Sequence, residues 1–455
     1  MPMIMPTQKT AESEPAGSAL VTEMRATALD IFMHTLAESS IARMFNKSVS
    51  YERGVLRVGD ESFDINSFAR IFVVAIGKAS HTMVQALSER FGAGAGVSGL
   101  ACGPLLPDAQ VFGYRYYKGG HPLPNQDSVK AAEAMLRAVE PLTGRDLVIF
   151  MLSGGGSALV EKPIASSISL EDLVATYRAL VHSGAPIAEI NTVRKHLSAI
   201  KGGRLALAAS PAHQLSIMIS DVPENALDSL ASGPTMPDTS TVEQCYALVD
   251  KYKLLPQFPA SVRQLFEGRA ILETPKPADA VFSRSRWCTL ASNAVAEKVA
   301  VEKAAMSGFA IEVDNSCDDW DYVPAADYLL KRLRELRKGV SRVCLISGGE
   351  ITVKVEGKGG VGGRNQHFAL YCAQKIAGEN ITVLSAGTDG IDGDSDAAGA
   401  VVDGTTMARI QQQGLSAEQA LKTFNSTPLF QSLGDVIMTG PTGNNLRDLR
   451  VLLAY

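Results

Sequence analysis

The chain has 455 residues, which exceeds the size that one hydrophobic core usually sustains and favours two domains of about 200 residues each. Hydrophobic residues make up 46% of it and charged residues 20%, the usage of a folded globular protein rather than of a disordered, collagen-like or disulfide-rich one. The formal net charge of -5 gives no electrostatic footprint for nucleic acid or for an anionic membrane, so small-molecule chemistry is the better expectation.

We expect no targeting signal in the first residues. Residues 1–18 are rich in Pro, Ser, Glu, Gly and Thr, and Lys9 is their one basic residue, so we predict a disordered tail. No run of 18 or more apolar residues occurs, which excludes a membrane-spanning helix. The six cysteines stand apart without a metal-ligand spacing, which predicts reduced thiols in a cytoplasmic protein.

The folded part begins with a predicted amphipathic helix over residues 19–42, whose apolar residues fall near helical spacing. Short apolar runs then alternate with helical segments. Runs this short, apolar on both sides, predict strands buried on both faces, as in a parallel sheet covered by helices. The fold class is therefore α/β. The predicted strands are residues 71–76, 147–152, 215–219, 343–346, 381–384 and 436–438.

The alternation of apolar strands with helices stops between residues 237 and 285, where five prolines occur and no buried strand is clear. This interruption predicts a domain boundary. We expect an N-terminal α/β domain over residues 19–240, a connecting segment over 241–285 and a C-terminal α/β domain over 286–455.

In open α/β sheets, ligands collect outside the carboxyl ends of the strands. The first candidate site of this kind is Gly77-Lys78, between a predicted strand and a helix that starts near residue 79. An ammonium group beside a helix N-terminus favours a phosphate or carboxylate ligand for Lys78. A solvated lysine at a turn is an equally good interpretation.

The second candidate is the stretch Ser153-Gly154-Gly155-Gly156-Ser157, directly after a predicted strand. Three glycines permit close backbone approach and a nest of N–H donors, which suits an oxyanion or a phosphate. The alternative is a tight turn that requires small residues. A partial echo, Ser347-Gly348-Gly349, follows the predicted strand over residues 343–346.

Basic residues cluster between residues 191 and 204. We predict a solvated face for Lys195 and Lys201 and leave Arg194 open as a contact for a substrate carboxylate or phosphate. Further on, Asp221 follows the predicted strand over residues 215–219 and is placed to orient a hydroxyl or a metal-bound water. The commoner role of such an aspartate is an Asx-type turn.

The densest glycine region leads into a predicted helix at Arg364. Gly357, Gly359 and Gly362 match the dinucleotide-binding pattern G-x-G-x-x-G. This pattern needs an acidic residue at a strand end about 20 residues on, whereas Asp389 comes later and is followed by several more carboxylates. A glycine loop that delivers Arg364 to a helix start fits better with a guanidinium clamping phosphate oxygens. A flexible surface hairpin is the alternative.

An acidic loop follows the predicted strand over residues 381–384. Asp392, Asp394 and Asp396 imitate the first ligands of a calcium loop, but Ala397 stands where that loop needs glycine, so we reject it. We favour Asp389 and Asp392 as the residues that position Mg²⁺ carried by a nucleotide, with solvated turn carboxylates as the alternative. The chain contains neither a P-loop nor protein-kinase signatures.

Taken together and in this order, these stretches resemble the class II glycerate kinases, the family whose C-terminal part is called the MOFRL domain. The resemblance covers residues 22–453 approximately. Its motifs are residues 74–79, 119–125, 152–158, 194–205, 220–222, 347–350, 362–366 and 387–390. The chain departs from the family pattern at residues 443–448, where a Thr and an Asn are replaced.

The resemblance implies a Rossmann-like N-terminal domain, a smaller α/β C-terminal domain, and an active site in the cleft between them. It implies ATP-dependent phosphorylation of D-glycerate to 2-phosphoglycerate, with Lys78 and Arg364 as the principal catalytic groups. We expect ATP and Mg²⁺ as cofactors, Asp221 as a base, and Ser153 and Arg194 as substrate contacts. The residues expected at the nucleotide phosphates are Gly154, Gly155, Gly156, Ser157, Gly348, Gly349, Gly362 and Gly363. Glycerate and ATP are the expected partners, with neither nucleic acid nor membrane, and the sequence leaves a homodimer open.

Two other functions compete with this prediction. An NAD(P)H-dependent hydroxypyruvate reductase rests on the G-x-G-x-x-G match, but no histidine has a clear acidic partner to act as proton donor. A non-catalytic anion-binding protein would use the same glycine loops without any turnover that depends on Mg²⁺.

Overall fold

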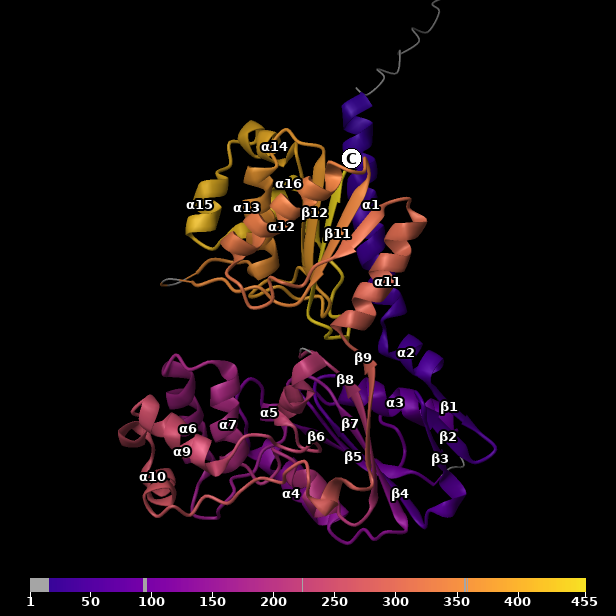
Figure 1. Ribbon diagram of the computed structural model, residues 1–455, viewed down its shortest axis with the longest axis vertical. Helices are drawn as coiled ribbons and strands as arrows, with labels where there is room; N and C mark the ends of the chain where they lie inside the picture. The colour runs from indigo at the N-terminus through magenta and orange to yellow at the C-terminus, as the bar shows by residue number, and fades with distance from the viewer. Residues whose placement is uncertain (1–15, 93–95, 223, 356, 358) are drawn as a thin grey trace, which may run out of the picture. The chain divides into compact units, whose positions relative to one another are not determined.

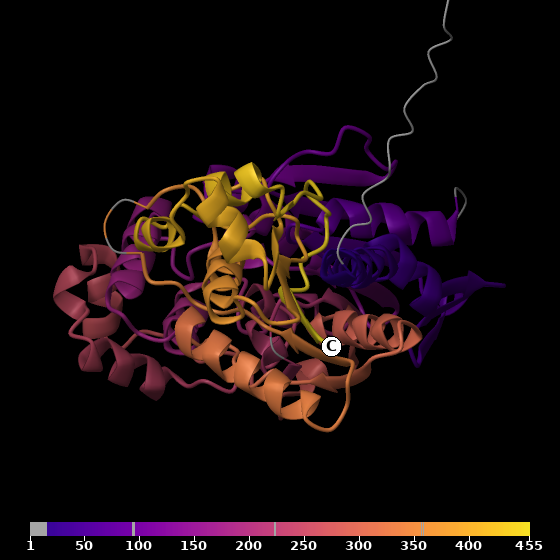
Figure 2. The same cartoon turned by 90° about the horizontal axis from the view of Figure 1, so that it is seen from above.

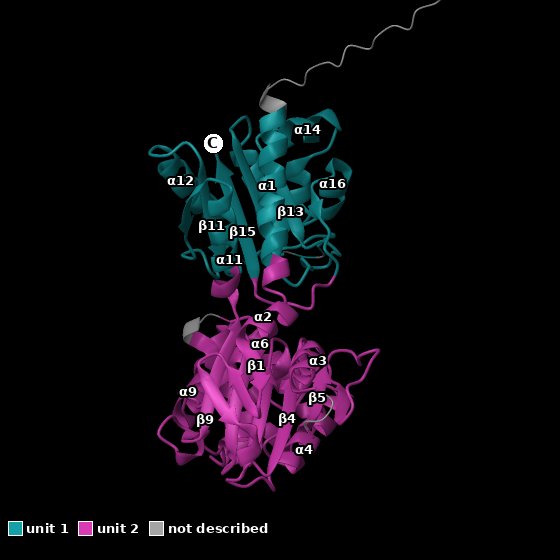
Figure 3. Cartoon of the chain, turned by 90° about the vertical axis from the view of Figure 1, so that its right-hand side faces the viewer, with its two compact units in different colours: residues 1–35, 297–440, 448–455 teal, residues 36–296, 441–447 magenta. Residues whose placement is uncertain are grey.

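The computed structural model describes residues 16–455 except 93–95, 223, 356 and 358. The chain forms two compact units (Figure 3). Unit 1 holds the described residues up to Thr35 together with residues 297–440 and 448–455, and unit 2 holds residues 36–296 and 441–447. Both units are therefore discontinuous in sequence.

Unit 2 is built on a six-stranded sheet with the order β6-β5-β4-β7-β8-β9, in which every pair is parallel. The three predicted strands of this region are confirmed, and every residue of β7 is buried. The strands are β4 Arg70–Ile76, β5 Ser98–Gly103, β6 Tyr114–Lys118, β7 Asp146–Leu152, β8 His213–Ile219 and β9 Ser285–Ala291. Because the strands are parallel, the loops after β4, β7 and β8 leave from one edge of the sheet.

Helices cover both faces of this sheet, as Figure 1 shows. The side chains of β4 alternate between two cores: Val73 belongs to the core that includes Met83 of α3, whereas Val74 belongs to the core that includes Met135 of α4. The helices are α2 Ile41–Ser48, α3 Ser80–Phe91, α4 Gln126–Val139, α5 Gly156–Leu159 and α8 Arg204–Ala209. A small antiparallel sheet adds β1 Val49–Glu52, β2 Val55–Val58 and β3 Glu61–Asp64.

A helical lobe of unit 2 contains most of the predicted connecting segment over residues 241–285. Its helices are α6 Leu170–His182, α7 Ile187–Leu197, α9 Val242–Lys251 and α10 Ala260–Glu267, which share one apolar core. The observed boundary differs from the predicted one because Pro256 and Pro259 lie at the starts of short helices and do not interrupt the fold. The 3-10 segment η2, Glu224–Ser232, runs beside this lobe and contacts α7 and α5.

Unit 1 contains a mixed sheet with the order β10-β11-β15-β12-β13-β14. Strand β15 lies in its centre, antiparallel to both neighbours, and is wholly buried. The strands are β10 Ala310–Val313, β11 Val343–Gly348, β12 Ile381–Gly387, β13 Gly399–Asp403, β14 Val436–Ile437 and β15 Asp448–Ala454. The chain thus ends on the strand that holds the middle of this sheet.

The helices of unit 1 lie on both faces of its sheet. Helices α12 and α13 pack on one face and share its apolar core, and α1 lies on the other face (Figures 1, 2 and 3). They are α1 Ala16–Glu38, α11 Asn293–Met306, α12 Tyr322–Arg337, α13 Arg364–Lys375, α14 Thr406–Gln412, α15 Ala417–Lys422 and α16 Ser426–Leu433. No helix among the described residues is both long enough and apolar enough to cross a bilayer.

Most of helix α1 belongs to unit 1, although the prediction assigned residues 19–42 to the N-terminal domain. The reason is an ion-pair network far away in sequence: Arg25 Nη1 lies 2.6 Å from Asp403, and its Nη2 lies 2.5 Å from Asp435. Residues 1–15 of the predicted tail lie outside the described residues, and α1 begins at Ala16.

Candidate active site

Lys78 lies at the carboxyl end of β4, between that strand and the start of α3. Its backbone N–H donates to the carbonyl of Gly154 at 2.8 Å, while its side chain is exposed. Gly77 before it has φ +125°, and a Cβ there would overlap Ser153. The chain is therefore fixed against the predicted glycine loop, and the ammonium group is accessible beside it.

The glycine loop itself turns sharply at Gly155, whose φ is +79°. A Cβ at Gly155 would lie 3.1 Å from Cγ of Lys78 and 3.2 Å from Cδ2 of His121. A Cβ at Gly154 would overlap the carboxylate of Asp221. The structure thus brings together Lys78, the glycine loop and Asp221. The glycines permit this close packing, whether or not the loop also holds an anion.

Ser153, whose predicted substrate contact stays a prediction, holds the start of α3. It is buried, and its Oγ accepts a hydrogen bond from the N–H of Ala79 at 3.0 Å. This bond satisfies one of the free N–H groups at the start of α3. The hydroxyl therefore holds the segment that carries Lys78.

Ser157 meets a segment that the sequence did not single out as functional. Its Oγ lies 2.9 Å from Oγ of Ser232. Ala231, Ser232 and Gly233 have consecutive positive φ values of 51°, 60° and 62°. The carbonyl of Ser232 accepts from the N–H of Gly202 at 3.0 Å, which fixes this left-handed turn beside the glycine loop.

Asp221 follows β8 at the same edge of the sheet. Its Oδ2 accepts from Nδ2 of Asn445 at 3.0 Å, and it lies against Gly154. Asn445 belongs to the stretch in which the chain departs from the family pattern. Sequence reasoning did not find this contact because 224 positions separate the two residues.

His121 is a second residue that sequence reasoning left without a role. Its ring lies beside Gly155, on the loop that follows β6. Partial burial and the nearby charge of Lys78 both lower the pKa of His121, which favours a neutral imidazole at pH 7. The one signal in the sequence was its place in a family motif, since no acidic residue adjoins it.

The prediction of a solvated face for Lys195 and Lys201 is wrong. Lys195 is buried, with Nζ 2.9 Å from Asp228 and 3.2 Å from Asp238. Lys201 is wholly buried and forms an ion pair with Glu161. The partners come from distant parts of the chain, so the local run of basic residues could not reveal them.

Arg194 lies in the same lobe, with its guanidinium carbon 5.0 Å from the centre of the Tyr177 ring. Burial lowers the pKa of Arg194, and the negative charge of Glu161 acts against that shift. Its Nε is buried without a hydrogen-bond partner among the residues that the structure describes. The substrate contact predicted for Arg194 stays a prediction.

In unit 1, Arg364 is the first residue of α13, as predicted. Its Nε lies 2.6 Å from Oδ2 of Asp448, and its Nη2 lies 3.0 Å from Oδ1 of Asp448 and 2.9 Å from Oε1 of Glu350. Burial disfavours the charged guanidinium, but the charge and hydrogen bonds of Asp448 outweigh it and hold the pKa of Arg364 above its usual value.

Asp392 caps α13 and is not placed to bind a metal. Its two oxygens accept from the backbone N–H groups of Asn365 and Gln366 at 3.0 and 2.9 Å, and from their side-chain amides at 3.3 and 3.1 Å. Burial raises the pKa of Asp392 to about 6. With all its acceptor sites occupied, the carboxylate is a helix cap, which the sequence could not distinguish from a metal ligand.

Gly362 and Gly363 pack tightly next to this cap. A Cβ at Gly363 would overlap Asp392, and a Cβ at Gly362 would overlap Oγ of Ser426. The two glycines therefore let the loop approach the acidic turn and Ser426. Their predicted contact with nucleotide phosphates stays a prediction.

Gly348 and Gly349, whose predicted contact with nucleotide phosphates stays a prediction, lie in a turn that a buried arginine holds. Their carbonyls accept from Nη2 of Arg450 at 2.6 and 3.0 Å, and the N–H of Gly348 donates to Oδ1 of Asn315 at 2.8 Å. A phosphate needs free N–H donors, and the N–H of Gly348 is already engaged. This turn binds a buried arginine of the chain itself.

Asp389 follows β12 and forms an Asx-type turn. Its Oδ1 accepts from the N–H of Ile391 at 3.1 Å. Across the described residues, no group of three or more His, Cys, Asp or Glu is arranged to hold a metal ion. Mg²⁺ that arrives with a nucleotide needs one or two protein carboxylates, so Asp389 stays a predicted contact.

The G-x-G-x-x-G match at Gly357, Gly359 and Gly362 lacks its structural context. A dinucleotide-binding loop links a strand directly to a helix, whereas here β11 ends at Gly348 and α13 begins only at Arg364. The structure gives no support to the reductase prediction at this loop.

Comparison with known proteins identifies the family. Residues 27–267 match a family described as "Domain of unknown function (DUF4147)", and residues 343–448 match the MOFRL family. The D-glycerate 2-kinase of Thermotoga maritima is 37% identical over 391 residues, which cover 84% of this chain and 89% of that protein. The chain belongs to the glycerate kinase family with a C-terminal MOFRL domain.

Other members support the same family assignment. The glycerate 2-kinase of Pyrococcus horikoshii is 34% identical over 402 residues, covering 87% of this chain and 89% of that protein. The solved structure of the Thermotoga maritima glycerate kinase superposes with a TM-score of 0.83 at 32% identity, covering 95% of this chain and all of that one. The resemblance seen in the sequence is confirmed, and so is the α/β fold class. Lys78 and Arg364 lie within the two matched regions.

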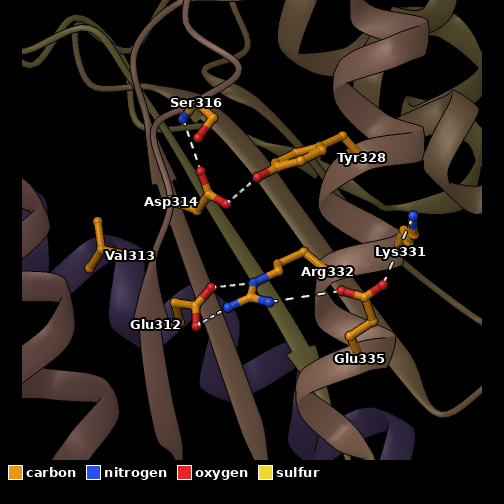
Figure 4. A pocket seen from close by; sticks show the side chains of 8 residues that line it. All are labelled: Glu312, Val313, Asp314, Ser316, Tyr328, Lys331, Arg332 and Glu335. Carbon is orange, nitrogen blue, oxygen red and sulfur yellow. Dashed lines mark hydrogen bonds and ion pairs between the residues drawn. The ribbon is translucent and has the colours of Figure 1, made fainter.

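The chain also has a cavity of about 360 Å³ in unit 1, between β10 and α12 (Figure 4). Its charged groups are paired with one another: Arg332 holds Glu312 at 2.5 Å, and Asp314 accepts from the hydroxyl of Tyr328 at 2.9 Å. Since these pairs satisfy the charges that line it, the cavity offers no strong recognition for a ligand.

Proposed function

We infer that this chain is an ATP-dependent phosphotransferase that converts D-glycerate to 2-phosphoglycerate. Membership of the glycerate kinase family supports this function, and relatives at 37% and 34% identity carry the names D-glycerate 2-kinase and glycerate 2-kinase. The observation that carries the proposal is the packing of Lys78 against the Gly154–Gly156 loop at the carboxyl edge of a parallel sheet.

Phosphoryl transfer needs chiefly positioning and positive charge, because negative charge is spread over the oxygens of the transferred group. In our proposal the ammonium of Lys78 neutralises part of this charge, and the backbone N–H groups of Gly154 to Ser157 hold phosphate oxygens of ATP. The guanidinium of Arg364 supplies a second positive charge. The exposed ammonium on a fixed backbone supports the role of Lys78.

Mg²⁺ carried with ATP would offset part of the negative charge on the phosphates. Of the two predicted metal contacts, Asp389 fits this role better, since its carboxylate is partly exposed. Asp392 does not fit, because its oxygens are occupied by four hydrogen bonds from the cap of α13.

The proton of the glycerate hydroxyl needs an acceptor at the glycine loop. Asp221 is the predicted base, and its contact with the loop at Gly154 supports it. His121 is a second candidate, because a neutral imidazole beside Gly155 can accept a proton. We place the reaction in the cytoplasm, on the pattern of isolated, free cysteines.

A ³¹P NMR time course with purified protein, ATP, Mg²⁺ and D-glycerate tests the proposal, with NADH and hydroxypyruvate in a parallel assay. We expect 2-phosphoglycerate to accumulate without NADH oxidation. A 3-phosphoglycerate signal would keep the kinase and overturn the position of transfer. NADH oxidation without phosphoryl transfer would indicate a reductase, and anion binding without any turnover would indicate a binding protein.

A further inference from the structure

The side chain of Arg364 is held by carboxylates from two other elements of unit 1. Asp448 is the first residue of the central strand β15, and Glu350 follows the carboxyl end of β11. Asp448 is buried, whereas Glu350 and Arg364 are both about one-third exposed, with 34% and 37% of their side chains accessible. The guanidinium of Arg364 is thus paired with one buried carboxylate, Asp448, and one partly exposed carboxylate, Glu350.

The geometry fixes which edge of the guanidinium is used. Asp448 binds in the bidentate manner, through Nε at 2.6 Å and Nη2 at 3.0 Å, and Glu350 lies 2.9 Å from Nη2. A planar fork held at two points cannot rotate about its long axis. The hydrogen bonds between described residues leave Nη1 unused, so this edge is the one that a phosphate can approach.

Both carboxylates are themselves held in place. Asp448 pairs with Gly387 in the register of β15 with β12. The turn that carries Glu350 is tied down by Arg450, whose Nη2 binds the carbonyls of Gly348 and Gly349 at 2.6 and 3.0 Å. These contacts restrict the movement of Asp448 and Glu350, as a preorganised charged site requires.

A second arginine offsets part of the carboxylate charge beside Arg364. Two carboxylates next to Arg364 alone would give it a net negative charge and weaken its attraction for phosphate. Arg450, which is wholly buried on β15 two residues after Asp448, supplies the second positive charge. Arg450 therefore offsets part of the negative charge that Asp448 and Glu350 bring to Arg364.

We propose that Asp448 and Glu350 are positioning residues that hold Arg364 by its Nε and Nη2 edge and so aim Nη1 at the transferred phosphoryl group. This inference rests on the proposed function, because it assumes that Arg364 stabilises charge during phosphoryl transfer. The competing explanation is that Asp448 only stabilises the fold of unit 1. The two explanations differ in how substitutions at Asp448 and Arg364 combine.

A double-mutant cycle separates them. Steady-state kinetics with ATP, Mg²⁺ and D-glycerate are measured for the full chain and for Asp448→Asn, Arg364→Ala and the double variant. We expect Asp448→Asn to lower kcat about 10- to 100-fold with a smaller change in KM, and to change kcat less than about twofold in the Arg364→Ala background. Additive losses, or an unchanged kcat in Asp448→Asn, would overturn the inference.

Chemical rescue gives a readout that a purely structural role would not move. Guanidinium chloride at millimolar concentration should restore part of the activity of Arg364→Ala, because Asp448 and Glu350 still form its binding site. We expect no rescue in the double variant Arg364→Ala/Asp448→Asn. Equal rescue in both variants would show that Asp448 does not position the guanidinium.

A matched control is available in unit 2, where Asp146 forms the same bidentate contact with Arg70 at 3.0 and 2.9 Å. Asp146→Asn should lower the melting temperature and leave kcat unchanged.

If Asp448→Asn fails to fold, Glu350→Gln tests the same contact at its more exposed partner, and an unchanged kcat in Glu350→Gln overturns the role of Glu350. If the wild-type protein is active and Asp448→Asn has the same kcat, only this inference fails. If the wild-type protein shows no turnover, the proposed function fails.

Discussion

Lys78 combines a fixed backbone with a free ammonium group, because its N–H binds Gly154 while its side chain is exposed. Lys78→Ala removes the charge and keeps this backbone contact. We expect kcat to fall by about 100-fold or more, as for other preorganised groups that stabilise transition-state charge, with the melting temperature nearly unchanged. Steady-state kinetics and thermal unfolding check this, and near-normal turnover would contradict the catalytic role.

Two glycines with similar left-handed conformations form a natural comparison. Gly155 has φ +79° and lies between Lys78 and His121, whereas Gly184 has φ +73° with no atom within 4 Å of an added Cβ. Replacement by alanine should reduce the free energy of unfolding by about 1–2 kcal/mol at either position, from backbone strain. We expect only Gly155→Ala to lower kcat strongly, measured alongside urea unfolding, because its Cβ would displace Lys78. Equal kcat losses in the two variants would contradict this.

Local chemistry was predictable from the sequence, and distant partners were not. The strand-Gly-Lys-helix pattern located Lys78, and the glycine loop located the start of α13 at Arg364. The roles of Ser153 and Asp392 as caps were missed, because a hydroxyl or carboxylate beside glycines looks the same whether it holds a helix or a ligand. The buried state of Lys201 was missed because its partner, Glu161, lies forty residues away.

Strands β4 and β7 are tied together at their first residues, Arg70 and Asp146, which are paired in the parallel register. Hydrogen bonds from Arg70, ahead of the opposing effect of burial, lower the pKa of Asp146 to about 2, with Thr143 contributing further hydrogen bonds. A carboxyl whose folded pKa is depressed stabilises the fold above its ordinary pKa near 4 and loses that contribution as the pH falls toward 2.

Asp146→Asn should therefore melt at a lower temperature than the wild type at pH 7. The difference should shrink as the pH falls from about 4 to 2, where the wild-type carboxyl becomes protonated too. Thermal unfolding of both proteins across this range measures the effect. A difference that stayed constant down to pH 2 would mean that the carboxylate charge contributes nothing to the pairing of β4 with β7.

At the level of elements, the sequence predicted the strands that are apolar on both faces, such as β7 and β12. It missed the helical lobe, because the prolines near α10 suggested a connecting segment although they stand where helices begin. Proline marks a helix start as readily as a break, and only the apolar faces of α9 and α10 against α6 and α7 decide between them.

The division of the whole chain also depended on long-range contacts. The sequence predicted two α/β domains, and two units are observed, but each is assembled from separate stretches. Helix α1 contributes to unit 1 through Arg25, and residues 441–447 belong to unit 2 although residues on both sides of them belong to unit 1. The hydrophobic periodicity of a segment does not show which unit it joins, because a helix has the same pattern whichever sheet it covers.

Arg25 offers a test of this assignment. Its guanidinium is held between Asp403 of β13 and Asp435 just before β14, and both carboxylates are buried. Arg25→Ala leaves them with Arg409 as the remaining cation in the network, 3.5 Å from Asp403 and 2.8 Å from Asp435. Uncompensated buried charge destabilises its surroundings. We therefore expect faster amide hydrogen exchange in β13 and β14, with β4 and β7 of unit 2 unchanged.

Hydrogen-exchange mass spectrometry of the full chain measures this. Arg43→Ala serves as the control, because Arg43 makes a long, exposed ion pair with Glu38 at 3.7 Å and should leave both units unchanged. Loss of protection confined to β13 and β14 would establish that the first helix is part of the C-terminal sheet domain in solution. Loss of protection in β4 and β7 instead would mean that α1 stabilises unit 2, and that the division of the chain follows the sequence order after all.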